Sequence, residues 1–170
     1  MDGQFYNSLL KAIQEAHTSR MPVILYKDQL LPEEFLTLDG YTVTIDLNGK
    51  TLSVREGLPI RVTGGEVTLT NSQSTGGIAV SSGGNGNAIQ VEGGSLTVES
   101  GVRLEGRSYG GFVSPAIEVT AGTVTLCPGA TLVNGIRAPE DSTWRGPAAF
   151  TAAVGSRQAA PRTRHQPSFR

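Results

Sequence analysis

A ten-residue pattern occurs four times in this chain and constrains the fold more than any other feature. The pattern reads apolar, any, apolar, any, small, any, any, apolar, Thr, apolar. The four copies occupy residues 36–45, 60–69, 89–98 and 117–126, so they begin 24, 29 and 28 residues apart. Each copy predicts two short strands that meet at a glycine-rich corner, because side chains alternate between the two faces of a strand. A repeat of this length is typical of a solenoid.

Stacking the copies predicts a continuous apolar core, because one copy cannot bury its apolar side alone. The remainder of each repeat supplies a third strand, expected at 51–54, 77–80, 102–105 and 131–133. Glycines 40, 64, 65, 93, 94 and 122 fall at the corners, where positive φ angles are expected. A β-sandwich would not explain the near-constant long period. The four inward columns are Leu36, Ile60, Ile89 and Ile117; Leu38, Val62, Val91 and Val119; Val43, Val67, Leu96 and Val124; and Ile45, Leu69, Val98 and Leu126.

The two ends of the chain differ from the repeat. Apolar residues at helical spacing predict one amphipathic helix over Phe5–Ala16, placed to cap the first coil, and Met21–Tyr26 predicts a first strand. From Arg137 onward the pattern is lost and the chain is rich in Arg, Pro and Ala, which predicts a disordered tail. We therefore expect a domain at 1–136 and a tail at 137–170.

Charge and cysteine content limit the partners and cofactors. The net charge is −1, which gives no reason to expect nucleic acid as a partner. Cys127 is the only cysteine, so no disulfide within the chain and no cysteine-based zinc cluster can form. His17 and His165 stand alone, and we expect no metal and no cofactor. The chain as given shows neither a basic leader with an apolar run nor a membrane-spanning segment.

Three segments carry a resemblance to a known superfamily. They are Leu10–Ala16, Val23–Asp28 and Val43–Leu52, the last with the turn Asp-Leu-Asn-Gly-Lys-Thr-Leu at 46–52. They resemble the opening of right-handed parallel β-helices of the pectin-lyase-like superfamily, and look closest to repeat regions of bacterial cell-surface proteins. The resemblance covers about residues 8–136 and implies right-handedness, an N-terminal helical cap and an extracellular setting. The fold we expect is all-β, a short right-handed parallel β-helix of about four to five coils.

Two carboxylates are candidates for catalysis, because glycosidic bond hydrolysis uses a pair of acids. Glu92 and Glu118 should face outward on adjacent coils, roughly 8 Å apart by strand geometry, within the range of an inverting hydrolase. Outward carboxylates on a solenoid are also expected simply to be solvated, and Arg61 lies diagonally from Glu92, where a weak surface pair is expected. No catalytic motif of the superfamily's enzymes is found in the chain.

A glycine-rich insertion at 106–112 supplies the candidate ligand-binding residues. It carries Tyr109 and Phe112, and exposed rings in loops are common sites for sugars. Packing of both rings over the core is the alternative. Thr44, Thr68, Thr97 and Thr125 recur at one outward position, which resembles the surface of some ice-binding proteins, but Glu66 interrupts the neighbouring column and Thr favours strands in any case.

These features favour a non-catalytic structural or carbohydrate-binding and adhesion module of a bacterial surface protein. A polysaccharide or cell-surface glycan is then the expected ligand, and an uncapped last coil would allow end-to-end self-association. The alternative is a fragment of a polysaccharide lyase or glycoside hydrolase of the same superfamily. The absence of a signal peptide from this chain means that surface localisation requires it to be part of a larger exported protein.

Overall fold

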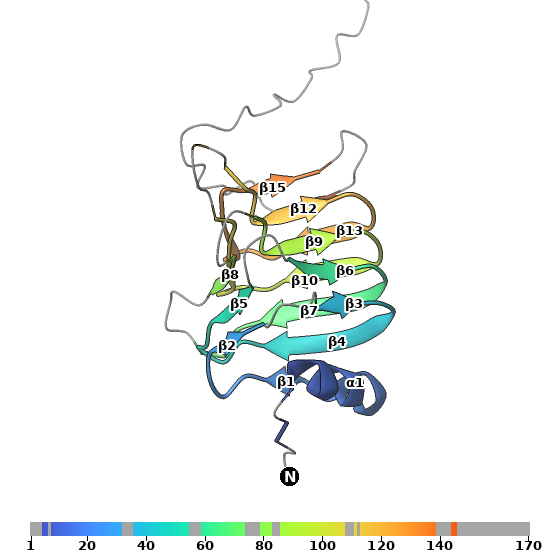
Figure 1. Ribbon diagram of the computed structural model, residues 1–170. Helices are drawn as coiled ribbons and strands as arrows, with labels where there is room; N and C mark the ends of the chain where they lie inside the picture. The colour runs from blue at the N-terminus through green and yellow to red at the C-terminus, as the bar shows by residue number, and fades with distance from the viewer. Residues whose placement is uncertain are drawn as a thin grey trace, which may run out of the picture.

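The computed structural model is built from short parallel strands and one helix (Figure 1). It describes residues 5–6, 8–31, 36–54, 59–73, 79–82, 86–107, 111, 113–138 and 144–145. The strands form three parallel sheets, and each strand pairs with strands three places away in the chain. We call three successive strands, one from each sheet, a level, so that β1, β2 and β3 make the first level.

Each sheet takes every third strand. Sheet A contains β1 (Val23–Ile24), β4 (Tyr41–Asp46), β7 (Gly65–Thr70), β10 (Ser95–Val98), β13 (Thr123–Leu126) and β16 (Trp144–Arg145). Sheet B contains β2 (Gln29–Leu30), β5 (Leu52–Val54), β8 (Ala79–Ser82), β11 (Arg103–Glu105) and β14 (Thr131–Val133). Sheet C contains β3 (Thr37–Leu38), β6 (Ile60–Val62), β9 (Ile89–Val91), β12 (Ile117–Val119) and β15 (Ile136–Arg137). The all-β, parallel, solenoid-like arrangement expected from the repeat is confirmed.

The four predicted inward columns are the core of the molecule. All sixteen residues of these columns are buried. The strand pairing stacks equivalent positions directly, as in Leu96 against Val67 and Val124. Leu52, Leu104 and Leu132 from sheet B complete the core. Each fully buried side chain of this size contributes about 1.5–3 kcal/mol, so the stacked columns supply the main stabilisation. The predicted third strands are also confirmed, except that 77–80 is found at 79–82.

The corner between sheets C and A leaves no room for side chains. Gly65, Gly94 and Gly122 are stacked at this corner with φ of 76°, 67° and 88°. A Cβ at Gly94 would lie 2.5 Å from the Gly65 carbonyl oxygen, and one at Gly122 would lie 2.6 Å from that of Gly94. Glycine is therefore required here both by its left-handed conformation and by the close approach of successive levels. The expected positive φ is not found at 64 or 93.

The C–A corner also has a constant length. Leu38 and Val62 precede the corner on successive levels and pair 24 residues apart, and Thr42 and Glu66, which follow it, pair at the same separation. The two sides of the turn between sheets A and B do not agree in this way. There the separation is 29 residues for Leu69 and Val98 but 24 for Val80 and Leu104. Variation in level length is therefore absorbed beside sheet B.

Polar side chains hold the turn between sheets A and B. The backbone Lys50 N–H donates to the Leu47 carbonyl at 2.8 Å, and Asn48 and Gly49 both have positive φ, the geometry that an Asn-Gly turn favours. The carboxylate of the buried Asp46 accepts from the Asn48 N–H at 2.8 Å and the Ser72 N–H at 2.9 Å. Asp46 therefore joins two levels as a structural group.

Two asparagines continue this connection between levels. Asn48 Nδ2 donates to the Leu25 carbonyl at 2.9 Å, toward the first level. Asn71 Oδ1 accepts from the Gly49 N–H at 3.0 Å, while its Nδ2 donates to the Gly101 carbonyl at 3.1 Å. Asn71 thus bridges the level below and the level above it.

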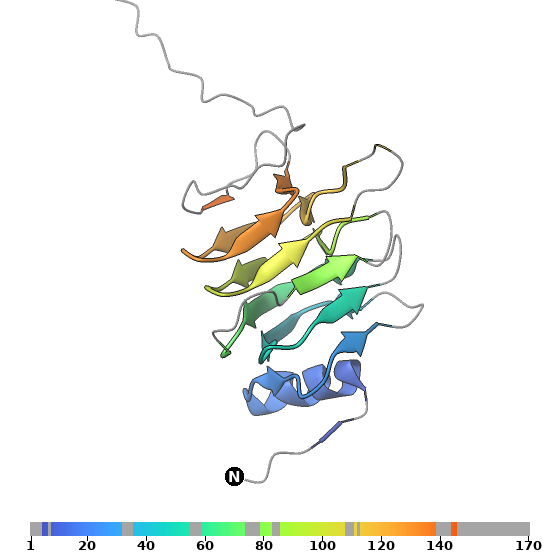
Figure 2. The same cartoon turned by 90° about the vertical axis from the view of Figure 1, so that its left-hand side faces the viewer.

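The N-terminal helix α1 (Leu9–Ser19) packs against β4 and β1 at the end of the stack (Figure 2). Its bounds differ from the predicted Phe5–Ala16 because Ser8 is extended and the helix continues to Arg20, which is left-handed and ends it. Pro22 then disfavours helical conformation at Met21. Ile13 and Ala16 are buried, as the predicted apolar stripe required. The first strand is also shorter than predicted, at Val23–Ile24 rather than Met21–Tyr26.

His17 replaces a strand partner at the edge of sheet A. β1 pairs with β4 only at Ile45 and Asp46, which leaves the beginning of β4 without a strand on that side. There the backbone N–H of Thr42 donates to His17 Nδ1 at 3.0 Å. The imidazole also meets the ring of Tyr41 edge-on, with centroids 5.5 Å apart. The sequence had assigned His17 no role, and the structure gives it one in capping this edge.

Parallel pairing continues past the expected domain limit at residue 136. Ile136 and Arg137 of β15 pair with Ile117 and Glu118, and β16 pairs with β13. Nearly all of 139–170 lies outside the described residues, including the predicted disordered tail. The domain limit therefore stays a prediction.

Gly65→Ala should destabilise the fold much more than Gly40→Ala. Both residues have positive φ, 76° and 72°, so both substitutions carry the left-handed penalty of about 1–2 kcal/mol. A Cβ at Gly65 would also overlap the Tyr41 carbonyl oxygen, whereas nothing lies within 4 Å of one at Gly40. We expect about 1–3 kcal/mol of additional loss for Gly65→Ala in urea unfolding. Equal losses would contradict the close approach at the corner.

Asn71→Ala should lower the free energy of unfolding by about 1–3 kcal/mol, because it leaves the Gly49 N–H and the Gly101 carbonyl without their partner. Ser72→Ala is the matched control, since Ser72 is exposed and contributes its backbone N–H. The control should stay within about 0.5 kcal/mol of the parent chain. Thermal and urea unfolding measure both, and indistinguishable variants would exclude the bridging role.

Candidate functional site

The predicted acids Glu92 and Glu118 both belong to the sheet C side of the molecule. Glu118 is the central residue of β12 and pairs with Gln90, and Glu92 follows two residues after Gln90 at the C–A corner. The predicted offset of one level and two residues is therefore confirmed. Both side chains are partly exposed, at 33% for Glu92 and 27% for Glu118.

Each of these acids has its own cationic partner. Glu92 Oε1 lies 3.7 Å from Arg61 Nε, the diagonal pair that the sequence predicted. Glu118 Oε1 accepts from Arg137 at 3.4 Å, and its Oε2 accepts from Asn87 Nδ2 at 3.1 Å. The carboxylates are thus engaged in two separate surface pairs. This arrangement stabilises a charged row along sheet C and supplies neither a free base nor a free acid.

The predicted ligand-binding residues Tyr109 and Phe112 lie outside the described residues. Their neighbours Gly106 and Arg107 are described, and Arg107 forms an antiparallel bridge with Gly86. The assignment of the two rings to a binding loop therefore stays a prediction.

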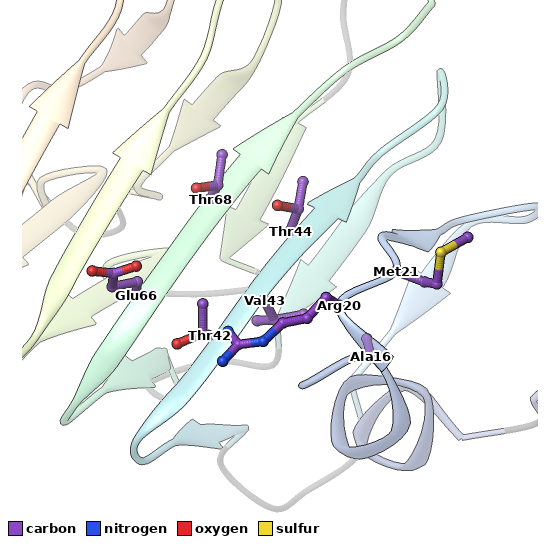
Figure 3. A pocket seen from close by; sticks show the side chains of 8 residues that line it. All are labelled: Ala16, Arg20, Met21, Thr42, Val43, Thr44, Glu66 and Thr68. Carbon is purple, nitrogen blue, oxygen red and sulfur yellow. The ribbon is translucent and has the colours of Figure 1, made fainter. Parts of the chain in front are cut away.

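A hollow of ≈ 220 Å³ lies where the end of α1 meets the outer face of sheet A (Figure 3). The helix side contributes Arg20, at the left-handed cap position, and the exposed Met21. The sheet side contributes outward residues of β4 and β7. The lining residues are Ala16, Arg20, Met21, Thr42, Val43, Thr44, Glu66 and Thr68.

Strand pairing fixes the polar groups of the hollow in two rows. Thr42 lies beside Glu66 and Thr44 lies beside Thr68, because β4 and β7 pair in register. The guanidinium of Arg20 reaches over β4 and lies beside Thr42 (Figure 3). Neighbouring strands are about 4.8 Å apart, so hydroxyl, carboxylate and guanidinium groups face one shallow, open space.

The chemistry of the hollow suits binding better than bond cleavage. Its lining holds one carboxylate, Glu66, whereas hydrolysis of a glycosidic bond uses two. The guanidinium donates several hydrogen bonds in a fixed plane, the carboxylate only accepts, and the threonine hydroxyls do both. Among the described residues, no group of three or more His, Cys, Asp or Glu side chains is placed to hold a metal ion.

Sequence reasoning noticed one part of this hollow and missed the other. Glu66 stood out because it interrupts a column of Thr and Ser on the outer face of sheet A. Arg20 gave no signal, because its position depends on where α1 ends and on how the helix packs against β4.

Comparisons with protein-family models, with curated proteins and with solved structures found no match for this chain. In the described part of the chain, no helix has the length and apolar character that a bilayer crossing requires.

Glu92→Gln and Glu118→Gln should each change the free energy of unfolding by less than about 1 kcal/mol, because both pairs are partly exposed and screened by water. Any loss should shrink as salt is raised. Glu99→Gln, at an exposed carboxylate, is the control. Denaturant titrations at low and high salt measure the effect, and a salt-independent loss well above this limit would show that the pairs are structural.

Proposed function

We propose that the chain is a right-handed parallel β-helix that works as a non-catalytic structural or carbohydrate-binding module of a bacterial cell-surface protein, and that carbohydrate binds at the hollow between α1 and sheet A. The resemblance of residues 8–136 to surface-protein repeats motivates the setting. The observation that carries the binding role is the hollow itself, with Arg20, Glu66 and three threonines facing one open space.

The pairing of the acids supports a non-catalytic role. Glu92 and Glu118 each contact an arginine, and neither lines the hollow. A lyase or hydrolase would require a carboxylate pair, or a carboxylate-held metal, beside its ligand. The alternative of an enzyme fragment therefore finds no favourable arrangement among the described residues.

The polar groups of the hollow fit the surface of a sugar. Adjacent hydroxyls of a pyranose both donate and accept, so they can bind a carboxylate and a guanidinium at the same time. A sugar that carries a carboxylate would gain a charge-assisted pair with Arg20. Glu66 would face the hydroxyls of the same ligand, one strand away from Thr42.

Arg20→Gln should weaken glycan binding about tenfold or more, because a hydrogen bond to a charged group contributes about 1.5–3 kcal/mol. Thr97→Val is the matched control. Thr97 lies in the same outward row as Thr44 and Thr68 but outside the hollow. A glycan array followed by isothermal titration calorimetry on the full chain measures the change. Failure of neutral and acidic glycans to bind, or equal affinity of Arg20→Gln and Thr97→Val, would refute the binding site.

Turnover distinguishes the module from an enzyme. We expect no new reducing ends and no unsaturated products from polysaccharides incubated with the full chain. Cleavage that disappears in Glu92→Gln or Glu118→Gln would replace this proposal with the catalytic alternative.

A further inference from the structure

Exposed apolar side chains gather at the first level of the stack. Among the described residues, seven large apolar side chains are exposed, and all except Val113 lie between residues 5 and 30. Four of them form a group that we call the first-level collar: Phe5 (83% exposed), Ile24 (40%), Tyr26 (66%) and Leu30 (62%). Phe5 and Tyr26 contact each other, with ring centroids 5.6 Å apart. A concentration of this kind marks an interaction surface.

The collar departs from the pattern of the levels above it. Ile24 pairs with Asp46, which pairs with Thr70 in the same row of sheet A. Leu30 pairs with Ser53 in sheet B, and the following residues of that row are Ser81 and Glu105. The neighbouring levels thus present polar residues where the first level presents apolar ones. Solvation of the outer surface does not require this change, whereas contact with a partner does.

The collar coincides with two strand edges. β1 and β2 are the terminal strands of sheets A and B, and neither has a second strand neighbour among the described residues. The helix covers the other part of this end, where His17 accepts from Thr42. An edge strand carries unpaired N–H and C=O groups that favour another strand.

We propose that the first-level collar binds a second copy of this chain, with the two copies related by a two-fold axis. A two-fold axis pairs like strands antiparallel, so the edge of β1 or β2 meets its own copy in an orientation that sheets accept. A lipid surface would bury the collar without satisfying the backbone groups of the edges. Lys27 and Asp28 are adjacent and exposed at the collar, so each can face its opposite charge in the second copy.

The oligomeric state tests this proposal on the full chain. Light scattering after size exclusion, and sedimentation velocity from micromolar to submillimolar concentration, should show a dimer in equilibrium with the monomer. Ile24→Lys and Leu30→Lys should each raise the dimer dissociation constant at least tenfold, because each places a charge in the buried contact. Val113→Lys, at the exposed apolar residue away from the collar, should leave the constant unchanged. Circular dichroism and thermal unfolding confirm that each variant remains folded.

Several outcomes would overturn the proposal. A parent chain that stays monomeric throughout the concentration range excludes it. So does a dimer that Leu30→Lys and Val113→Lys affect equally, or one that is lost on Thr131→Pro at the β14 edge while Leu30→Lys leaves it intact. Co-sedimentation of the monomer with anionic or zwitterionic phospholipid vesicles, abolished by Leu30→Lys, would assign the collar to a membrane surface instead.

Discussion

The close approach of successive levels at the corner between sheets C and A is the constraint on which the rest of the structure depends. Gly65, Gly94 and Gly122 meet backbone carbonyl groups of the level below, and a side chain at any of them would push two levels apart. Because the corner fixes both the spacing and the offset of the levels, the strands on either side of it pair in one register. The inward columns then stack residue on residue, and the outward rows follow with the same period.

This dependence explains how much could be predicted from the sequence. Leu38, Val62, Val91 and Val119 were placed correctly because their positions follow from the repeat alone. The ends of α1 were misplaced, because they depend on the conformations of Ser8 and Arg20, which the apolar stripe does not report. The hollow was missed for a related reason: it exists only where the helix end meets sheet A, and no local pattern links Arg20 to Thr42 or Glu66. The pair Arg61 and Glu92 was predictable because both belong to the repeat.

The functional features are departures from the repeat. A regular level buries its inward residues and presents small polar residues outward, which gives a stable but chemically uniform surface. Glu66 breaks a column of Thr and Ser, Ile24 and Leu30 break polar rows, and Arg20 is brought in by an element outside the repeat. Each departure places a group where stability of the stack does not require it. These positions are therefore where recognition can differ while the fold stays the same.

The unequal lengths of the levels divide the molecule into two sides with different freedom to change. The C–A corner keeps one length at each described level, so an inserted residue there would shift every contact in two sheets at once. The connections on either side of sheet B already differ by several residues between levels while the strands remain in register. Sheet B is consequently the side on which the chain can acquire new loops, and with them new specificities, without altering the core.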